Sequence, residues 1–195
     1  MANLRPLRND EIDDKRILER FEHYARTRGF TPNSIRTMAR RPAIVRAFMD
    51  LNQAVLYEGT VARDLKMLVS LASSIASGCR YCQSHMSNLS SIYEVPDEKI
   101  NALWSFESSD LFNAGERAAI RLALKAGQVP NAAEPEDFAE LGRHFDEGQI
   151  VEIVAAIALF GYLNRWNDTM ATELEDHPRR VTERAVPAWQ PGKHA

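Results

Sequence analysis

The sequence predicts an all-α protein, and three observations support this fold class. Apolar residues recur at helical spacing through most of the 195 residues, as in the stripe formed by Leu65, Leu68, Val69, Ala72 and Ile75. Proline, glycine and capping residues separate these stripes at the points where helices are expected to begin and end. No stretch alternates apolar and polar residues with β-branched enrichment between turns, so the signals of a strand are missing.

The first six helices are assigned in order from their stripes and breaks. They are expected over residues 12–28, 32–39, 42–59, 61–76, 79–93 and 96–104. Gly29 ends the first, and Thr31-Pro32 is an N-cap followed by a proline at the first position of the second. Pro42 opens the third helix and Gly59 ends it, while Ser77-Gly78 separates the fourth helix from the fifth.

The second half of the chain follows a loop at residues 107–113. Helices are expected over 114–126, from the acidic start at 134–137 to residue 145, and over a long apolar stretch from 147 to about 175. Residues 176–195 contain three prolines and little periodicity, so they are predicted to form an extended tail. We therefore expect one helical domain over 1–175, with a first part at about 42–104 and a second at about 114–175.

Composition restricts the class of protein. Apolar residues make up 45% of the chain and charged residues 26%, which is ordinary for a globular domain. A net charge of −3 gives no reason to expect nucleic-acid binding. The longest apolar run, Ile153 to Leu159, is too short to cross a membrane, and the N-terminus lacks the apolar stretch of a signal peptide. We therefore expect a cytoplasmic protein that binds neither nucleic acid nor membrane.

The segment Gly78–His85 contains both cysteines of the chain and one of its five histidines. Two thiols three residues apart on a helix lie one turn apart, within reach of a disulfide, and a helix N-terminus favours their thiolates. His85 follows Cys82 by three residues and can take its proton. The spacing predicts redox chemistry in which Cys82 attacks a peroxide and Cys79 captures the sulfenic acid as a disulfide. An external dithiol reductant would then restore the thiols.

Two other interpretations of the cysteines stay open. They can be small buried side chains without a reaction, or they can bind zinc together with His85. A structural zinc site takes four ligands, and the sequence has no second cysteine pair, so we expect no bound metal and no cofactor. A thioredoxin-like oxidoreductase also uses this motif, but its fold needs a parallel sheet.

The motif and the helices together resemble the carboxymuconolactone decarboxylase superfamily, and more narrowly its alkylhydroperoxidase AhpD-like, peroxidase-related branch. The resemblance rests on an amphipathic helix, the Gly-Cys-x-Tyr-Cys segment with its histidine, and the run Asn164–Asp168 after an apolar helix. It covers residues 42–175. It implies a two-part helical bundle, a homo-oligomer (a trimer or a multiple of one), and a thiol-dependent peroxidase acting on hydroperoxides. By this resemblance Cys82 is the peroxidatic cysteine, Cys79 the resolving cysteine and His85 part of a proton relay.

Two positions depart from the pattern of the family. The family's histidine commonly lies four residues after the second cysteine, where this chain has Met86, and the shift to His85 rotates the ring by about 100°. The family's relay glutamate lies twelve residues before the first cysteine, where this chain has Met67, which cannot carry a proton. If the chain is a peroxidase, another group has to replace that glutamate.

Three carboxylates are candidates for this role. Asp64 lies one turn before Met67, where a solvated surface position is the simpler interpretation. Glu152 is flanked by apolar residues, so it is either a first-turn residue that complements the helix dipole or a buried group whose raised pKa suits acid–base work. Asp168 can pair with Arg165 one turn earlier, as a structural ion pair.

Other functions remain possible at this point. A lactone decarboxylase of the same superfamily is one, although such members generally lack the redox pair. A non-enzymatic thiol sensor or a metal-binding oligomer is another, and the missing relay glutamate favours it. A purely structural oligomer is the third. The physiological substrate, the reductant, the oligomer size and the role of the tail do not follow from the sequence.

Overall fold

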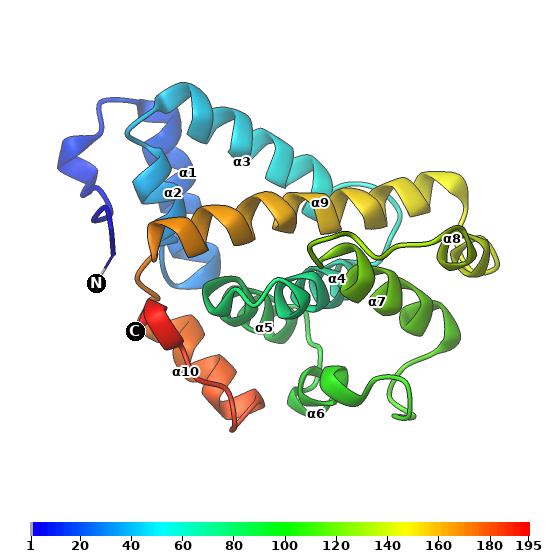
Figure 1. Ribbon diagram of the computed structural model, residues 1–195. Helices are drawn as coiled ribbons and strands as arrows, with labels where there is room; N and C mark the ends of the chain where they lie inside the picture. The colour runs from blue at the N-terminus through cyan, green and yellow to red at the C-terminus, as the bar shows by residue number, and fades with distance from the viewer. Residues whose placement is uncertain (1) are drawn as a thin grey trace.

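The computed structural model describes residues 2–195, and all regular secondary structure within that range is helical (Figure 1). The α-helices are α1 (Lys15–Arg28), α2 (Asn33–Met38), α3 (Pro42–Tyr57), α4 (Arg63–Ala76), α5 (Arg80–Ile92), α6 (Asp97–Asn101), α7 (Ala114–Ala126), α8 (Pro135–Leu141), α9 (Glu147–Met170) and α10 (Asp176–Ala185). Three short 3-10 turns are η1 (Asn9–Glu11), η2 (Ala102–Ser105) and η3 (Gly192–His194). The predicted all-α fold class is confirmed.

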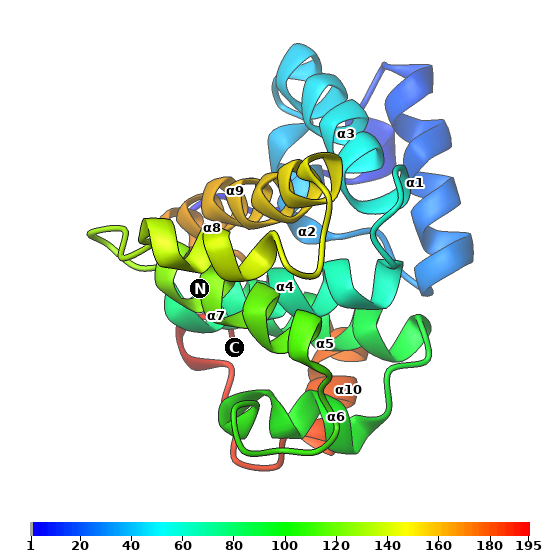
Figure 2. The same ribbon diagram turned by 90° about the vertical axis from the view of Figure 1, so that its right-hand side faces the viewer.

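Helices α4 and α5 form the centre of the molecule. Helix α4 packs against α5, α7 and α9, and α5 packs against α9 and α10. Every residue from Leu65 to Ser74 of α4 and from Tyr81 to Ser90 of α5 is buried, as expected for helices that are covered on all sides. Figure 2 shows α1 and α3 at one end of the molecule, α6 and α10 at the other, and α4 and α5 between them. The cysteine motif therefore lies in the core.

Helix α5 begins where the sequence predicts it. Gly78 has a φ of 74°, a left-handed conformation that side chains with a Cβ rarely adopt, and it ends the path of α4. Cys79 is the N-cap of α5, and its sulfur accepts a hydrogen bond from the backbone N–H of Cys82. The turn from α4 to α5 thus places Cys79 and Cys82 at a helix N-terminus.

Helix α9 is shorter than predicted. It ends at Met170, because Ala171 takes a left-handed conformation with φ 47° and the N–H of Thr172 donates to the carbonyl of Asn167. Neither glycine nor proline marks this stop, which is why the sequence analysis extended the helix to residue 175. The early stop leaves residues 171–175 free to turn back towards α5.

The prediction of an extended tail is wrong. Residues 176–185 form α10, because Pro178 lies in the first turn, where proline is tolerated. Helix α10 docks on α5 through the buried Thr182, whose hydroxyl donates to the backbone carbonyl of Ser84 at 3.2 Å. Beyond it, the indole of the buried Trp189 donates to Gln83 of α5 at 3.0 Å. The C-terminal residues are thus part of the core.

Helix α9 meets the length and composition required to cross a membrane. In this fold, however, it packs against α3, α4, α5 and α7, which is the position of a core helix. Val151 and Tyr162 on α9 remain 67% and 42% exposed. Such exposed apolar side chains are compatible with the expected homo-oligomer, which stays a prediction.

Glu152 lies on α9, and its carboxylate binds the turn between α3 and α4 to that helix. Its carboxylate pairs with the Lys66 ammonium at 2.7 Å and accepts the backbone N–H groups of Thr60 at 2.8 Å and Val61 at 3.0 Å. Burial opposes its ionisation, but these partners outweigh burial and lower the pKa of Glu152 to about 2. Of the two interpretations that the sequence leaves open for Glu152, the buried group with a raised pKa is therefore wrong. Gly59 is required here, because a Cβ would lie 2.3 Å from the Glu152 carboxyl group.

Replacing Glu152 with glutamine should lower the free energy of unfolding at pH 7 by about 2–4 kcal/mol, because Lys66, with a side chain only 1% exposed, loses its counter-charge. The folded pKa lies below the unfolded one. This contribution is therefore complete above about pH 4.5 and is lost as the pH falls towards 2. Urea unfolding of both proteins at pH 7 and pH 3 should show a smaller difference at pH 3. Asp64→Asn on α4 is the control, with an expected cost below about 1 kcal/mol; an equal loss in the two variants would contradict the assignment.

Candidate functional site

The two cysteines are buried free thiols at the start of α5. The sulfur of Cys79 lies 3.5 Å from the backbone nitrogen of Cys82, whose N–H donates a hydrogen bond to it. Cys79 is 0% exposed and Cys82 is 2% exposed. The one-turn spacing therefore brings the two sulfurs together, as the sequence predicts.

The two thiols differ in acidity. The hydrogen bond from Cys82, together with His194 and the Cys82 N–H, outweighs burial and lowers the pKa of Cys79 to about 6. Burial and the adjacent Cys79 raise the pKa of Cys82 well above its ordinary value. These opposite shifts favour the thiolate on Cys79 over the thiolate on Cys82.

Cys82 lines a small cavity of about 40 Å³. Most of the wall is apolar or aromatic, formed by Tyr24, Ile35, Phe48, Leu56, Tyr81, Met86, Leu89, Phe160 and Leu163. Among the lining residues that the structure describes, only Arg28 is partly exposed, so it marks the entrance. Its guanidinium lies 4.4 Å from the centre of the Tyr24 ring and donates to the Tyr57 hydroxyl. The cavity suits a small, mostly apolar molecule that meets Cys82.

His85 lines the same cavity and is held by Glu175. Its Nε2 lies 2.7 Å from the Glu175 carboxylate, and the Tyr81 ring stacks on the imidazole at 4.2 Å between centres. The Tyr81 hydroxyl donates to the same carboxylate at 3.0 Å, and the backbone N–H of Asn33 donates to it as well. A carboxylate accepts, so Nε2 carries a hydrogen and Nδ1 remains as the ring nitrogen that can exchange a proton.

Glu175 places a carboxylate beside His85, although the position of the family's relay glutamate is Met67 in this chain. Burial opposes ionisation of Glu175, but the charge and hydrogen bond of His85 and the backbone donors outweigh it and lower its pKa. Met67 is itself fully buried in α4. Glu175 was not a candidate in the sequence analysis, because the predicted helix ran through it. Its position depends on the left-handed turn at Ala171.

Asn167 of α9 also contacts Cys82. Its Nδ2 donates to the carbonyl of Leu163 at 3.0 Å and to the Cys82 sulfur at 3.3 Å. A backbone carbonyl can only accept, so this contact fixes the orientation of the amide. The buried Oδ1 of Asn167 has no hydrogen-bond partner among the described residues. It is available to an N–H or O–H group of a bound molecule.

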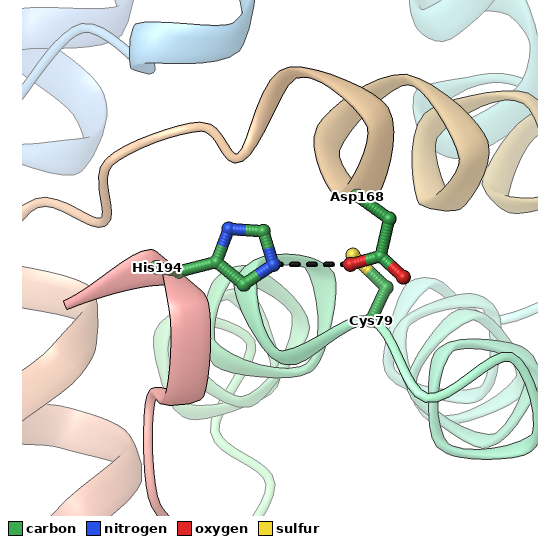
Figure 3. Close-up of side chains that lie close together, drawn as sticks. All are labelled: Cys79, Asp168 and His194. Atoms are coloured by element: carbon green, nitrogen blue, oxygen red, sulfur yellow. Dashed lines mark hydrogen bonds and ion pairs between the residues drawn. The ribbon is translucent and has the colours of Figure 1, made fainter. Parts of the chain in front are cut away.

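Asp168 does not pair with Arg165, which donates to the Gly161 carbonyl instead. Its carboxylate lies 3.1 Å from Nε2 of His194 and 3.3 Å from the Lys193 ammonium. Figure 3 shows the Asp168 carboxylate joined to the His194 ring, with the Cys79 sulfur beside them. The ligand atoms of Cys79, Asp168 and His194 lie within 4.8 Å of one another. The α9 side chains Asn167 and Asp168 thus contact one cysteine each.

This second group contains donors that a divalent metal could use. A thiolate, an imidazole and a carboxylate are three of the four ligands that structural zinc takes. The Lys193 ammonium, however, occupies the same carboxylate with a positive charge. Direct ion pairing between Asp168 and His194 explains the arrangement without a metal.

The predicted site residues therefore separate into three places. Cys82 and His85 meet at the cavity, Cys79 and Asp168 meet behind it, and Glu152 lies at the α3–α4 turn. Sequence reasoning missed the roles of Glu175, Asn167, Tyr81 and His194. Asn167 belongs to the Asn164–Asp168 run that carried the resemblance. Tyr81 belongs to the Gly-Cys-x-Tyr-Cys segment of the same resemblance, whereas Glu175 and His194 gave no signal that could be separated from an ordinary structural position.

Comparison with known proteins agrees with this fold and motif. The model of the carboxymuconolactone decarboxylase family matches residues 42–125, which span α3 to α7. The debrominase Bmp8 superposes with a TM-score of 0.85 at 34% identity, over 93% of this chain and 96% of its own. A complex of a Bmp8 cysteine-to-alanine variant with 2,3,4-tribromopyrrole is equally similar, at 33% identity and a TM-score of 0.85.

Two further relatives are more distant. An uncharacterized peroxidase-related protein with an alkylhydroperoxidase AhpD core, from Ralstonia eutropha JMP134, shares the fold with a TM-score of 0.79 and 24% identity, over 91% of this chain and 94% of that one. The uncharacterized protein YdfG of Bacillus subtilis (strain 168) is 24% identical over 128 residues, which are 65% of this chain and 84% of YdfG. Residues 42–125 thus match the carboxymuconolactone decarboxylase family, and the whole chain shares the fold of Bmp8 and of the protein with the AhpD core.

Removal of the Asn167 amide should make Cys82 less reactive. In a Cys79→Ser background Cys82 is the only thiol of the chain, so its alkylation by iodoacetamide can be followed directly. Asn167→Ala should slow alkylation at pH 8 about tenfold, because one hydrogen bond to the thiolate is lost in a buried site. The control is Asn164→Ala, one turn earlier on α9, whose buried amide has no partner among the described residues. Equal alkylation rates in the two variants would disprove the role of Asn167.

Proposed function

We propose that the protein is a dithiol reductase, which transfers two electrons from Cys82 and Cys79 to a small electrophile held in the cavity. The observation that carries this proposal is the division between the two sulfurs. Cys82 lines the cavity with His85, whereas Cys79 lies one helical turn behind it, completely buried. A substrate can therefore react at Cys82, and Cys79 is in position to complete a disulfide.

An organic hydroperoxide is the substrate class that the sequence predicts. The Cys82 sulfur attacks the terminal oxygen, the O–O bond breaks, and the alcohol leaves with the thiol proton, giving a sulfenic acid. The Cys79 thiolate then attacks the Cys82 sulfur and expels hydroxide, which takes up a proton relayed from solvent by His85 and leaves as water. One hydroperoxide thus yields one alcohol, one water and one disulfide. An external dithiol returns the pair to its reduced form.

A halogenated aromatic ring is the second candidate class. The similarity to the debrominase Bmp8 over nearly the whole chain favours it, as does the aromatic lining of the cavity. The Cys82 sulfur takes the halogen, the C–X electron pair stays on the ring, and the proton of the Cys82 thiol, relayed by His85, replaces the halogen. Attack by Cys79 then forms the disulfide and expels halide. The free Oδ1 of Asn167 can accept a ring N–H.

The two substrate classes differ in the room that they need in the cavity. A cavity of about 40 Å³ holds only a few water-sized groups, so a ring requires a side chain to move aside. Arg28 is the partly exposed member of the lining and is therefore the side chain that a larger substrate displaces.

The reductase proposal predicts a defined stoichiometry. Reduced protein should lose two thiols for each cumene hydroperoxide consumed, or for each bromide released from a bromopyrrole, and should turn over with a dithiol reductant. Cys82→Ser should abolish both reactions, and Cys79→Ser should stop turnover after the first chemical step. Thiol titration with peroxide and bromide assays measures this. Equal rates for wild type and Cys82→Ser would refute it, and disulfide formation without turnover would indicate a thiol sensor.

The relay predicts a graded effect. His85→Gln should reduce turnover about 10²–10⁴-fold, because it removes the proton donor at the cavity. Glu175→Gln should cost about tenfold, because an amide oxygen still accepts from Nε2 but carries no charge. The control is His177→Gln on α10, an exposed position whose rate should match wild type. Steady-state rates with the preferred substrate decide the matter, and a wild-type rate for His85→Gln would exclude the relay.

A further inference from the structure

The second half of the reaction depends on Cys79, and the residues around Cys79 differ from those around Cys82. Cys79 is 0% exposed and lies next to the C-terminal turn η3, which brings His194 against the end of α9. His194 is 1% exposed and belongs to the segment that the sequence analysis expected to be an extended tail. A buried histidine fixed beside a buried thiol requires a physical explanation.

The contacts of His194 determine its protonation state. Its Nδ1 lies 2.8 Å from the backbone carbonyl of Thr172, which can only accept, so Nδ1 carries a hydrogen. Its Nε2 faces the Asp168 carboxylate at 3.1 Å and lies within 4.8 Å of the Cys79 sulfur. Carboxylates and thiolates also accept, so both ring nitrogens carry hydrogens. The ring is therefore an imidazolium.

We propose that His194, held in place by Asp168, is the cation that keeps the resolving cysteine Cys79 ionised. This inference rests on the proposed dithiol chemistry, in which Cys79 makes the second attack. His194 is a positioning residue for the reacting sulfur, and Asp168 acts through His194.

The charged groups around the pair are consistent with this role. Burial opposes the charge on His194, but the contacts to Cys79, Thr172 and Asp168 outweigh it and raise the pKa of His194. The Asp168 carboxylate repels a thiolate on Cys79. The Lys193 ammonium, which lies 3.3 Å from the Asp168 carboxylate, offsets part of that repulsion. Cys79 and His194 are buried, whereas the Asp168 and Lys193 side chains are 32% and 54% exposed. Together they place two anionic groups beside two cationic ones.

This arrangement also assigns the roles of the sulfurs during reduction. When Cys79 attacks, the S–S bond forms, the bond from the Cys82 sulfur to hydroxide or halide breaks, and that group leaves with the electron pair. In this step Cys79 loses one electron and the oxidised Cys82 sulfur gains one, so that over both steps each sulfur has lost one electron relative to the dithiol. When a dithiol reductant later attacks Cys82, Cys79 is the leaving group, and the adjacent imidazolium stabilises the departing thiolate. The same cation therefore assists Cys79 in both directions.

The test uses a chain with one thiol. In Cys82→Ser, Cys79 is the only cysteine, so thiolate absorbance at 240 nm reports its ionisation as a function of pH. Adding His194→Gln should raise the titration midpoint by at least about one pH unit, which is about tenfold less thiolate below the midpoint. Adding His177→Gln, the other histidine of the C-terminal residues 176–195, should leave the midpoint unchanged. Equal midpoints with and without His194 would overturn the proposal.

A reciprocal measurement keeps the proposal testable if His194→Gln does not fold. Linkage requires that loss of the Cys79 charge lowers the pKa of His194. NMR titration of the His194 ring in Cys82→Ser and in the Cys79→Ser/Cys82→Ser double variant should show that fall, and an identical pKa in the two would contradict the pairing. One equivalent of zinc in the purified protein, lost with His194→Gln, would instead identify a metal site and overturn the imidazolium assignment.

Neither measurement uses a substrate or a reductant. An unchanged Cys79 midpoint with normal peroxide or halide turnover would refute the role of His194 alone. A shifted midpoint without any turnover would support the ionic pair and refute the proposed function.

Discussion

The site depends on one constraint, namely that helix α5 begins at Cys79. The left-handed Gly78 ends the path of α4, and the Cys79 sulfur then caps α5 by accepting the N–H of Cys82. One turn later Cys82 reaches the cavity, and a further turn brings His85 to the same wall. Since α4 and α5 are buried along most of their length, these side chains are held by the core rather than by a surface loop. A different starting residue would separate the two sulfurs from their partners.

Around this helix start, the C-terminal third of the chain supplies the polar partners. The end of α9 provides Asn167 and Asp168, the segment after Ala171 provides Glu175, and η3 provides His194. The result is two carboxylate–imidazole pairs, one on each side of the dithiol. The pair formed by Glu175 and His85 faces the cavity, and the pair formed by Asp168 and His194 faces the sealed sulfur. Each pair is assembled from segments distant in sequence, which explains why α10 and η3 are packed so firmly on α5.

The sequence was sufficient for the parts of this architecture that depend on local signals. Helical stripes predict the fold class, and the Ser77-Gly78 break predicts the position of Cys79, Cys82 and His85. The errors arise where tertiary contacts override local preference. Ala171 adopts a left-handed conformation that alanine rarely takes, so nothing in the sequence foretells the stop of α9 or the position of Glu175. The partners of Glu152 and Asp168 are likewise distant in sequence. Helix α10 was missed because the C-terminal residues contain three prolines, one of which lies in the first turn of that helix, where proline is tolerated.

The complete burial of Cys79 also affects how the protein would be damaged. Irreversible sulfinic and sulfonic acids form when a sulfenic acid meets a second oxidant molecule before a thiol reaches it. Cys82 lines the cavity, whereas the neighbouring sulfur of Cys79 is completely buried. Overoxidation would therefore accumulate on Cys82 only. The Cys79 thiolate, one helical turn away, would shorten the time for which a sulfenic acid on Cys82 is exposed to a second oxidant. Shielding the second sulfur in the core thus protects the repair partner of the first.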